Sequence, residues 1–308
     1  MWLINYQVHI LHLKVRLKRL IDEKIIDQYD SHDLINSKII GSGGSASVYI
    51  AKWKNTLTKC AIKKFVDDKE VCLTYMANSH DNIIQFRGVT KLEDEKKYSL
   101  VLEYANGGTL RDHLRNNTIT FKWEDQLRFS KEIASAILWL HDVKEITHGD
   151  LHPNNILIHN DTIKLADFGC SCLKESDDNT RVHGVIPYMD PKFFENHSYR
   201  ITEKSDIYSL GVLFWELTSR RSPFKYKSGD DYVLRIRILN DLREEPIQNT
   251  NAIFVRLYQK CWQHEPDNRP NIHQVISELN RINYENNIIP ALGESEESEN
   301  TDDLCLSD

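Results

Sequence analysis

Two short strings in the middle of the chain hold the residues best suited to phosphate chemistry. Residues 148–155 read HGDLHPNN, and residues 167–169 read DFG, twelve positions after Asn155. The carboxylate of Asp150 can orient a hydroxyl group and accept its proton, which is the work of a general base. Asn155 and Asp167 offer oxygen ligands of the kind that Mg²⁺ prefers, at the spacing used around a nucleotide γ-phosphate. An asparagine-rich turn would explain the first string alone, but the two strings in this order predict phosphoryl transfer.

A glycine-rich segment upstream offers a second phosphate-binding feature. Residues 41–48 read GSGGSASV, and glycines let backbone amides approach phosphate oxygens closely. A plain hairpin is the simpler explanation of such a match, and a dinucleotide-binding fold would need a helix directly after it. Residues 48–51 are instead rich in β-forming side chains, which favours a loop held between two strands. The candidate phosphate-binding residues are Gly41, Ser42, Gly43, Gly44, Ala46 and Val48.

A lysine near this loop is the candidate for holding the nucleotide phosphates. Lys63 ends the β-type run 60–63, and an ammonium there can reach the α- and β-phosphates if a carboxylate fixes its position. Strand alternation turns the adjacent Lys64 to the opposite face. Glu70, in a predicted helix at residues 69–77, is the suitably placed acid, although only six residues separate it from Lys63. The sequence therefore predicts a Lys63–Glu70 ion pair.

The segment at residues 102–105 is the candidate binding site for an adenine base. An extended chain there would offer a backbone carbonyl and an amide to the base, with apolar side chains as the walls of the pocket. Leu102 would line the back of that pocket. The candidate base-binding residues are Ala61, Leu102, Glu103, Ala105 and Leu157.

The pattern of β-forming and helical segments divides the chain into a small β-rich lobe and a larger helical lobe. Strands are predicted at residues 38–40, 48–51, 59–65, 84–89 and 98–103. The texture changes near residues 105–109. One helical stripe then covers residues 123–141, and further helices are predicted at 204–218, 231–242, 252–263 and 272–282. The predicted fold class is α+β with two unequal lobes.

Composition argues against several classes of function. The 308 residues are 40% hydrophobic and carry a formal net charge of -7, and residues 294–308 contain seven acidic and no basic side chains. The remainder is balanced, so no electrostatic footprint for nucleic acid is expected. Six scattered cysteines form neither a metal pattern nor a disulfide framework, and no segment has the pattern of a membrane span or a signal peptide. Reduced thiols and a cytoplasmic location are expected.

Residues 1–34 are interpreted as an extension before the β-rich lobe. Apolar side chains between residues 8 and 26 fit a strand and a helix equally, so periodicity leaves both open. A basic cluster is formed by Lys14, Arg16, Lys18 and Arg19. For this cluster a solvated face is favoured over contact with an anionic membrane.

At these motifs the chain resembles the eukaryotic protein kinase family, over about residues 35–282. Asp206 resembles the aspartate at a helix start that braces the catalytic loop, and residues 188–191 resemble the end of an activation segment. Cys261, Trp262 and residues 266–270 resemble the C-terminal signature of the tyrosine-kinase-like serine/threonine group. The resemblance implies a bilobal kinase domain at residues 35–283, with lobes at 35–104 and 105–283, followed by an acidic tail at 284–308 that is expected to be disordered.

The resemblance also implies an activity and its reactants. It implies ATP and Mg²⁺ as cofactors, a protein substrate, and transfer of the γ-phosphate to Ser/Thr hydroxyls. The catalytic residues would be Asp150, Lys63 and His152, and the metal ligands would be Asn155 and Asp167. A pseudokinase that acts as a nucleotide-binding scaffold or interaction module is the alternative, and tyrosine specificity stays open.

One departure from the family pattern bears on regulation. Gly149 stands where most of the family has Arg, which removes a cation that would grip a phosphorylated activation loop. Ser171, Ser176 and Thr180 lie in that segment. They are interpreted either as phosphosites or as ordinary exposed polar residues of a loop.

Two further departures bear on activity and on stability. His152 stands where serine/threonine kinases usually carry Lys, and an imidazole carries its charge only part of the time at neutral pH. Weaker stabilisation of transition-state charge is therefore expected. Lys192 replaces the Glu that would pair with Arg269, so Asp190 or Glu195 is expected to form that pair instead.

Overall fold

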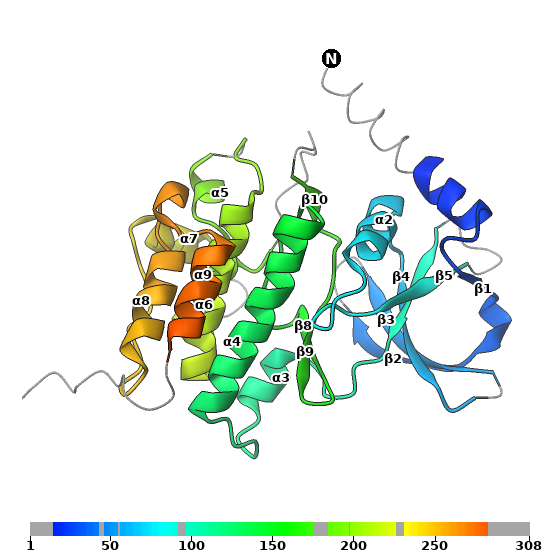
Figure 1. The fold of residues 1–308 in the computed structure, drawn as a ribbon, viewed down its shortest axis with the longest axis horizontal. Helices are drawn as coiled ribbons and strands as arrows, with labels where there is room; N and C mark the ends of the chain where they lie inside the picture. Colours follow the sequence, from blue (N-terminus) through cyan, green and yellow to red (C-terminus); the bar gives the residue numbers. More distant parts are fainter. Residues whose placement is uncertain are drawn as a thin grey trace, which may run out of the picture.

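A six-stranded sheet forms the small lobe of the protein in the computed structural model (Figure 1). The structure describes residues 15–42, 46–54, 56–91, 97–174, 184–196, 198–225 and 231–282. The strands are β1 (Gln28–Tyr29), β2 (Leu34–Ser42), β3 (Ser47–Trp53), β4 (Lys59–Lys64), β5 (Phe86–Thr90) and β6 (Ser99–Glu103). Their order is β1-β5-β6-β4-β3-β2, in which β1 runs parallel to β5 and the other neighbours are antiparallel. The predicted strands correspond to β2 to β6, whereas β1 was not predicted.

Helix α2 (Asp68–Ala77) packs beside β5 and carries Glu70 in its first turn. The Asp67 side chain accepts a hydrogen bond from the Glu70 backbone N–H at 2.8 Å, which is the usual way for an aspartate to begin a helix. This cap fixes where the helix starts and therefore the direction in which the first turn presents Glu70.

Four long helices form the core of the large lobe. They are α4 (Trp123–Leu138), α6 (Glu203–Ser219), α8 (Ala252–Cys261) and α9 (Ile272–Arg281). All residues of α6 from Ser205 to Leu217 are buried, so this helix is covered on every side by the others. Shorter helices complete the lobe: α3 (Leu110–Arg115), α5 (Lys192–Glu195) and α7 (Asp231–Leu239). The predicted helices correspond to α2, α4, α6, α7, α8 and α9.

Two small strand pairs hold the loops that contain the motifs. Strand β7 (Ile146–Thr147) pairs with β10 (Cys172–Leu173), and β8 (Ile156–His159) pairs with β9 (Thr162–Leu165). The HGDLHPNN string lies between β7 and β8, and the DFG string lies between β9 and β10. Because both loops are tethered at each end by paired strands, their side chains are brought to one place.

The described part of the extension is a helix over residues 15–22 followed by β1. This resolves the choice between strand and helix for residues 15–22 in favour of a helix. In the part of the chain that is described, no helix has both the length and the apolar character needed to cross a bilayer. Residues 284–308, and with them the expected disorder of the tail, lie outside the described residues.

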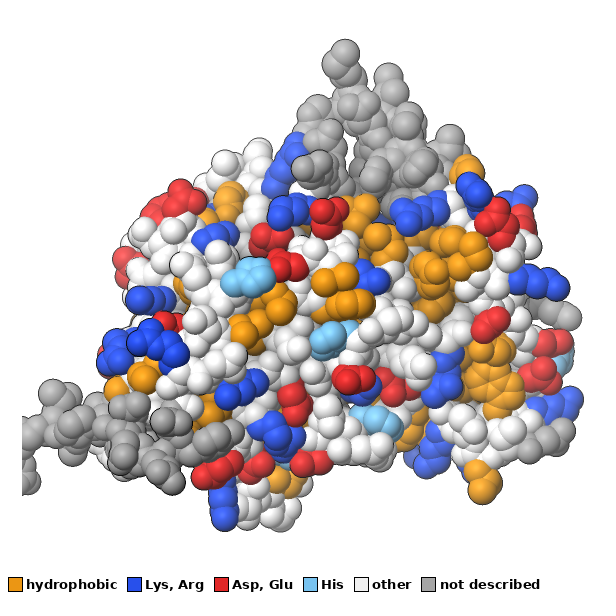
Figure 2. Space-filling model, in the orientation of Figure 1, with side chains coloured by type: hydrophobic (Ala, Val, Ile, Leu, Met, Phe, Trp, Pro, Cys, Tyr) orange, Lys and Arg blue, Asp and Glu red, His pale blue; other side chains and the backbone are white. Residues whose placement is uncertain are grey.

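Charged side chains of both signs are mixed on one face of the molecule. On the face drawn in Figure 2, the Lys and Arg side chains of the described residues are interspersed with Asp and Glu side chains.

Candidate active site

Lys63, near the end of β4, lies between two carboxylates. Its Nζ is 2.7 Å from Glu70 Oε1 on α2 and 2.7 Å from Asp167 Oδ1 in the loop after β9. The Lys63 and Glu70 side chains are 10% and 9% exposed, whereas that of Asp167 is 41% exposed. Buried charges need close, well-placed partners to offset the loss of hydration, and the shared ammonium provides this. The predicted Lys63–Glu70 contact is therefore present, and the same lysine also joins the small lobe to the large one.

The three charged groups shift one another's pKa values. Burial raises the pKa of the Glu70 carboxyl to about 7, and the nearby Lys63 offsets only part of this. Burial also opposes the charge on Lys63, but Asp167 and Glu70 outweigh it and raise the pKa of the ammonium. Burial opposes the charge on Asp167 as well, but Lys63, the Gly169 N–H and the nearby His148 together outweigh it and lower the pKa of that carboxyl. Lys63 and Asp167 are thus the firmly charged pair, and Glu70 titrates near neutrality.

We expect Glu70 to make the stability of the nucleotide-free protein depend on pH. The pKa of Glu70 is about 7 in the folded protein, against an ordinary value of 4.5. Its contribution to the free energy of unfolding is therefore full below pH 4.5 and lost as the pH rises through about 7. Glu70→Gln removes this titration, so Tm of the wild type minus Tm of the variant should fall between about pH 5 and about pH 8. A Tm difference that stays level or rises over this pH range would contradict the raised pKa of Glu70. Glu124→Gln, at an exposed position on α4, is the control.

Asp150, Asn155 and His152 form a second cluster on the loop between β7 and β8. The Asn155 amide nitrogen donates to the Asp150 backbone carbonyl at 2.8 Å and to its carboxylate Oδ2 at 3.1 Å. His152 Nε2 lies 3.4 Å from the same Oδ2, and His152 Nδ1 accepts the Asn154 backbone N–H at 3.2 Å. Because Nδ1 is an acceptor, the proton of a neutral His152 sits on Nε2 and faces Asp150. The side-chain nitrogen of Asn155 thereby orients Asp150. The side-chain oxygen of Asn155 lies on the other side of that amide group.

A buried aspartate at the start of α6 anchors this loop. Asp206, which is 1% exposed, accepts the backbone N–H groups of His148 and Gly149 at 2.8 and 2.9 Å. The His141 ring contacts the same carboxylate at 2.8 Å. Burial opposes the Asp206 charge, but the contacts with His141, the nearby His148 and the Gly149 N–H together outweigh it and lower the pKa of Asp206. Asp206 therefore fixes the backbone just ahead of Asp150, as the resemblance implied, and His141 is a partner that the sequence reasoning missed.

The candidate base-binding residues gather around one hydrophobic cluster. Ala61 and Leu102 are buried members of this cluster, and Val48, Ala105 and Leu157 pack against it. Its members come from both lobes, as expected for a pocket between them. A further member, Ala166, immediately precedes Asp167 and was missed by the sequence reasoning, although its place before the DFG string was an available signal.

The side chain and the backbone N–H of Glu103 are already engaged in contacts within the protein. Its backbone N–H donates to the Gln85 carbonyl at 2.9 Å, and its carboxylate accepts the Gln85 N–H at 2.7 Å and lies 3.2 Å from Lys164 Nζ. The side chain and amide are thus engaged by β-sheet and interlobe contacts. For base recognition this leaves the Glu103 carbonyl as the relevant group.

The glycine-rich segment closes a hairpin between β2 and β3. Gly41 pairs with Val48 and Ser42 pairs with Ser47 across the two strands. The predicted arrangement, a loop held between strands, is therefore confirmed. Gly43 and Gly44 lie outside the described residues, whereas Ala46 is the residue just before β3.

The donor set at Asn155 and Asp167 fits a hard, oxygen-binding cation. The Ala166 N–H donates to the Asn155 carbonyl at 2.8 Å, which ties the two loops together beside these side chains. Among the described residues no group of three or more His, Cys, Asp or Glu side chains could enclose a metal. Mg²⁺ does not require such an enclosure, because it keeps several waters and substrate phosphates alongside one or two protein ligands.

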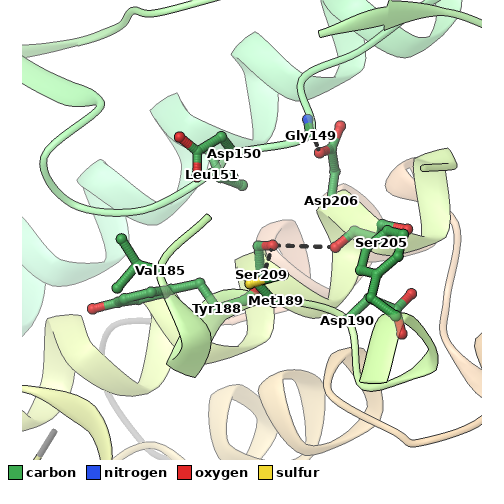
Figure 3. Close-up of a pocket in the computed structure, with 11 residues that line it drawn as sticks. Gly149, Asp150, Leu151, Val185, Tyr188, Met189, Asp190, Ser205, Asp206 and Ser209 are labelled. Atoms are coloured by element: carbon green, nitrogen blue, oxygen red, sulfur yellow. Dashed lines mark hydrogen bonds between the residues drawn. The ribbon is translucent and has the colours of Figure 1, made fainter. Parts of the chain in front are cut away.

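A small pocket adjoins Asp150. Figure 3 shows it between the catalytic loop, residues 185–190 and the start of α6. Val185, Tyr188 and Met189 supply apolar lining. Ser209 donates to the Tyr188 carbonyl at 2.7 Å, which fixes this wall to α6. The Asp150 carboxylate thus stands beside a small hollow that is lined by both polar and apolar side chains.

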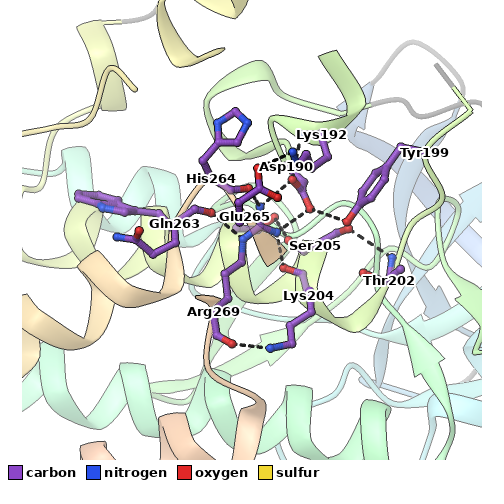
Figure 4. Close-up of polar contacts among 12 residues, drawn as sticks. Asp190, Lys192, Tyr199, Thr202, Lys204, Ser205, Gln263, His264, Glu265 and Arg269 are labelled. Atoms are coloured by element: carbon purple, nitrogen blue, oxygen red, sulfur yellow. Dashed lines mark hydrogen bonds and ion pairs between the residues drawn. The ribbon is translucent and has the colours of Figure 1, made fainter. Parts of the chain in front are cut away.

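Arg269 is held by an aspartate, and Lys192 is held by two other acids. Asp190 binds the guanidinium of Arg269 with two hydrogen bonds of 2.6 and 2.8 Å (Figure 4). Lys192 Nζ turns to Glu195 at 2.8 Å and to Glu265 at 2.7 Å. Of the two candidates named from the sequence, Asp190 takes the arginine and Glu195 takes the lysine, so the two cations are kept apart.

Gly149 and Ser171 are explained by close packing of the two loops. Gly149 has a φ of +78°, and a Cβ there would lie 2.7 Å from the Cys170 carbonyl oxygen, so a larger residue would have to move the chain. Ser171 is fully buried and donates to the His148 carbonyl at 2.8 Å. Of its two interpretations, that of an ordinary exposed loop residue is therefore wrong, and that of a phosphosite stays a prediction; Ser176 and Thr180 lie outside the described residues.

Comparison with known proteins agrees with this architecture. The family model described as "Protein kinase domain" matches residues 34–279. The chain therefore belongs to the protein kinase family, and its two lobes are those of that fold.

Curated relatives carry kinase names. Putative serine/threonine-protein kinase/receptor R826 of Acanthamoeba polyphaga mimivirus is 32% identical over 250 residues, which is 77% of this chain and 14% of that protein. Mitogen-activated protein kinase kinase kinase 13-B of Xenopus laevis is 34% identical over 247 residues, 78% of this chain and 24% of that protein. RGS domain-containing serine/threonine-protein kinase A of Dictyostelium discoideum is 29% identical over 287 residues, 87% of this chain and 24% of that protein. The chain thus spans 14% to 24% of the length of these relatives.

Proposed function

We propose that the protein transfers the γ-phosphate of ATP to Ser or Thr hydroxyls of protein substrates. The observation that carries the proposal is the contact of Lys63 with both Glu70 and Asp167, at 2.7 Å each. This places the phosphate-binding cation, its supporting acid and a metal-type ligand together in one arrangement. Membership of the protein kinase family and the serine/threonine-kinase names of the relatives support the same reaction.

Lys63 and the metal ligands prepare the triphosphate. Lys63 holds the α- and β-phosphates, and Glu70 keeps its ammonium in place. Since Lys63 contacts Asp167 directly, binding of the phosphates exchanges that contact for phosphate oxygens and leaves the Asp167 carboxylate to the metal. Bound Mg²⁺, held by Asn155 and Asp167, would neutralise phosphate charge during transfer.

Asp150 receives the substrate hydroxyl. Two hydrogen bonds from the Asn155 amide, one to its carbonyl and one to its carboxylate, hold the side chain in one orientation. The carboxylate then accepts the hydroxyl proton as the oxygen attacks phosphorus. His152, whose Nε2 faces Asp150 at 3.4 Å, adds positive charge near the transferring group when it is protonated.

The proposed substrates are proteins. The side chains of Val185, Tyr188 and Met189 lie beside Asp150, where they would contact a residue next to the acceptor hydroxyl. The mixed charge on the face drawn in Figure 2 fits the further proposal of a cytoplasmic protein without a nucleic-acid partner.

The proposal is tested by incubating the purified chain with Mg²⁺ and radiolabelled ATP, alone and with generic protein substrates. We expect incorporation of label into Ser or Thr, read by phosphoamino-acid analysis. Asp167→Ala should abolish it, because the variant loses the metal-type carboxylate that contacts Lys63. No incorporation by the wild type, together with ATP-induced thermal stabilisation, would instead establish the pseudokinase that Gly149 and His152 suggest. Label on Tyr would overturn the specificity alone.

A further inference from the structure

Helix α2 is buried around its whole circumference. Residues 70–74 are all buried, and five consecutive positions exceed the ~3.6 residues of one helical turn. Leu73 and Ala77 belong to the main core cluster of the large lobe, while Glu70 faces Lys63. A helix that is buried all round must be covered on its remaining side by another element.

The extension provides that cover. Val71 and Cys72 of α2 belong to a second hydrophobic cluster, whose members include Leu17 from the helix at residues 15–22. Leu17 is 1% exposed, whereas Val15 two positions earlier is 61% exposed. In Figure 1 the helix lies next to α2 and the β5 side of the sheet.

A backbone contact at the edge of the sheet anchors the extension. The Val89 N–H on β5 donates to the Asp27 carbonyl at 2.9 Å, directly before β1. A Cβ at Gly88 would lie 2.2 Å from the same carbonyl oxygen, so the approach depends on a glycine in β5. Ile26, between the helix and this contact, is 2% exposed and joins the same cluster as Leu17. The segment is therefore seated at two points, on α2 and on β5.

We propose that Leu17 is a positioning residue for phosphoryl transfer. The helix at residues 15–22, seated by Leu17 and anchored through Asp27, holds α2 so that Glu70 stays at Lys63. This rests on the proposed function, and it adds a determinant outside the family match, which begins at residue 34. Leu17 and Ile26 thus act on the site only through their packing against α2 and β5, and not by contact with the reactants.

Hydrogen exchange tests the seating without any need for catalysis. Leu17→Ala removes the buried side chain, and Val15→Ala removes an exposed one from the same helix. We expect the backbone amides of α2 to exchange faster in Leu17→Ala only, with α8 in the large lobe unchanged. Equal exchange of α2 in wild type and Leu17→Ala would overturn the proposal, whatever the activity.

A double-mutant cycle tests whether the effect passes through Glu70. We expect Leu17→Ala to lower kcat for phosphoryl transfer about tenfold, a loss that Val15→Ala does not share. In a Glu70→Gln background, the same Leu17→Ala change should alter kcat by less than about twofold, because the acid that α2 positions is already neutral. Equal loss in both backgrounds would overturn the positioning role and leave a general packing role.

A second variant approaches the extension from β5. Gly88→Ala should displace Asp27 and speed exchange in α2 in the same way, since its Cβ would lie 2.2 Å from the Asp27 oxygen. If Leu17→Ala does not fold, Leu17→Val and Gly88→Ala carry both measurements. A wild type without phosphoryl transfer would defeat the proposed function, and the exchange of α2 would still decide whether the extension seats that helix.

Discussion

Asp150→Asn is expected to lower the rate of phosphoryl transfer by about 10²–10⁴-fold while leaving the affinity for ATP nearly unchanged. The substitution keeps the shape of the side chain. It also keeps an oxygen that can accept the hydrogen bond from the Asn155 amide, which is 3.1 Å long in the wild type. What is lost is the ability to accept the hydroxyl proton. Asp167, which contacts Lys63 at 2.7 Å, is untouched, so the phosphate-binding arrangement persists.

The measurement separates chemistry from binding. Single-turnover kinetics gives the rate of transfer, and fluorescence titration with an ATP analogue gives the affinity. Asp241→Asn makes the same change of charge at a side chain that is 78% exposed and lies 3.7 Å from Arg243, and it should leave both quantities unaltered. A rate for Asp150→Asn within about tenfold of the wild type would remove Asp150 from the role of general base.

The chemistry of the site could be predicted from the sequence because it resides in short local strings. Asp150 and Asn155 are five residues apart and contact each other within one loop, so local spacing carries the information. Lys63 and Glu70 are similar: the capping of α2 by Asp67 orients Glu70 across the short connection. The residues beyond these strings are contributed by distant parts of the chain.

Contacts set by tertiary packing could not be predicted in this way. Leu17 and Val71 join one cluster across more than fifty residues, and the apolar period of residues 8–26 fits a strand as well as a helix. The two-residue strand β1 carries too few side chains to have a period at all. The register of β1 on β5 depends on the missing side chain of Gly88, whose importance is visible only beside its folded neighbour.

The departures from the family pattern could likewise be recognised from the sequence, but their structural causes could not. Gly149 could be recognised as unusual from the sequence, but its cause is the Cys170 carbonyl 2.7 Å from where a Cβ would stand. A lysine in place of a glutamate at position 192 predicted that another acid must pair with Arg269. Two acids were candidates, and only packing decided that Asp190 takes Arg269.

Asp190→Ala is expected to destabilise the protein by about 3–5 kcal/mol, because it leaves a buried guanidinium without its counter-charge. The Arg269 and Asp190 side chains are both 0% exposed. The hydrogen bonds use every N–H group that an arginine has to offer. Two go to Asp190, at 2.6 and 2.8 Å, and three go to the carbonyls of Gln263, Lys204 and His264, at 2.7, 2.9 and 2.7 Å. For a domain of this size the destabilisation corresponds to a fall in Tm on the order of 10 °C.

Lys192→Ala is the contrasting variant. Lys192 pairs with Glu195 and Glu265, whose side chains are 39% and 57% exposed. Partly exposed ion pairs are screened by solvent, so their removal should cost no more than about 1 kcal/mol. Scanning calorimetry on both variants therefore distinguishes a buried pair from a surface pair two residues away. Equal falls in Tm for the two variants would contradict the assignment of Asp190 as the buried partner of Arg269.

Restoring a carboxylate at position 192 should recover part of the stability that Asp190→Ala removes. The Lys192 backbone N–H donates to Asp190 Oδ1 at 3.0 Å, so residue 192 begins beside the carboxylate that holds Arg269. Asp190→Ala combined with Lys192→Glu recreates the arrangement that the family resemblance implies, with the glutamate as the partner of Arg269. Its Tm should exceed that of Asp190→Ala combined with Lys192→Ala, which supplies no charge. Recovery stays incomplete because the new carboxylate also faces Glu195 and Glu265, the former partners of Lys192. Equal Tm values for the two double variants would mean that Arg269 needs a carboxylate placed as it is at position 190. A negative charge nearby would then not be enough.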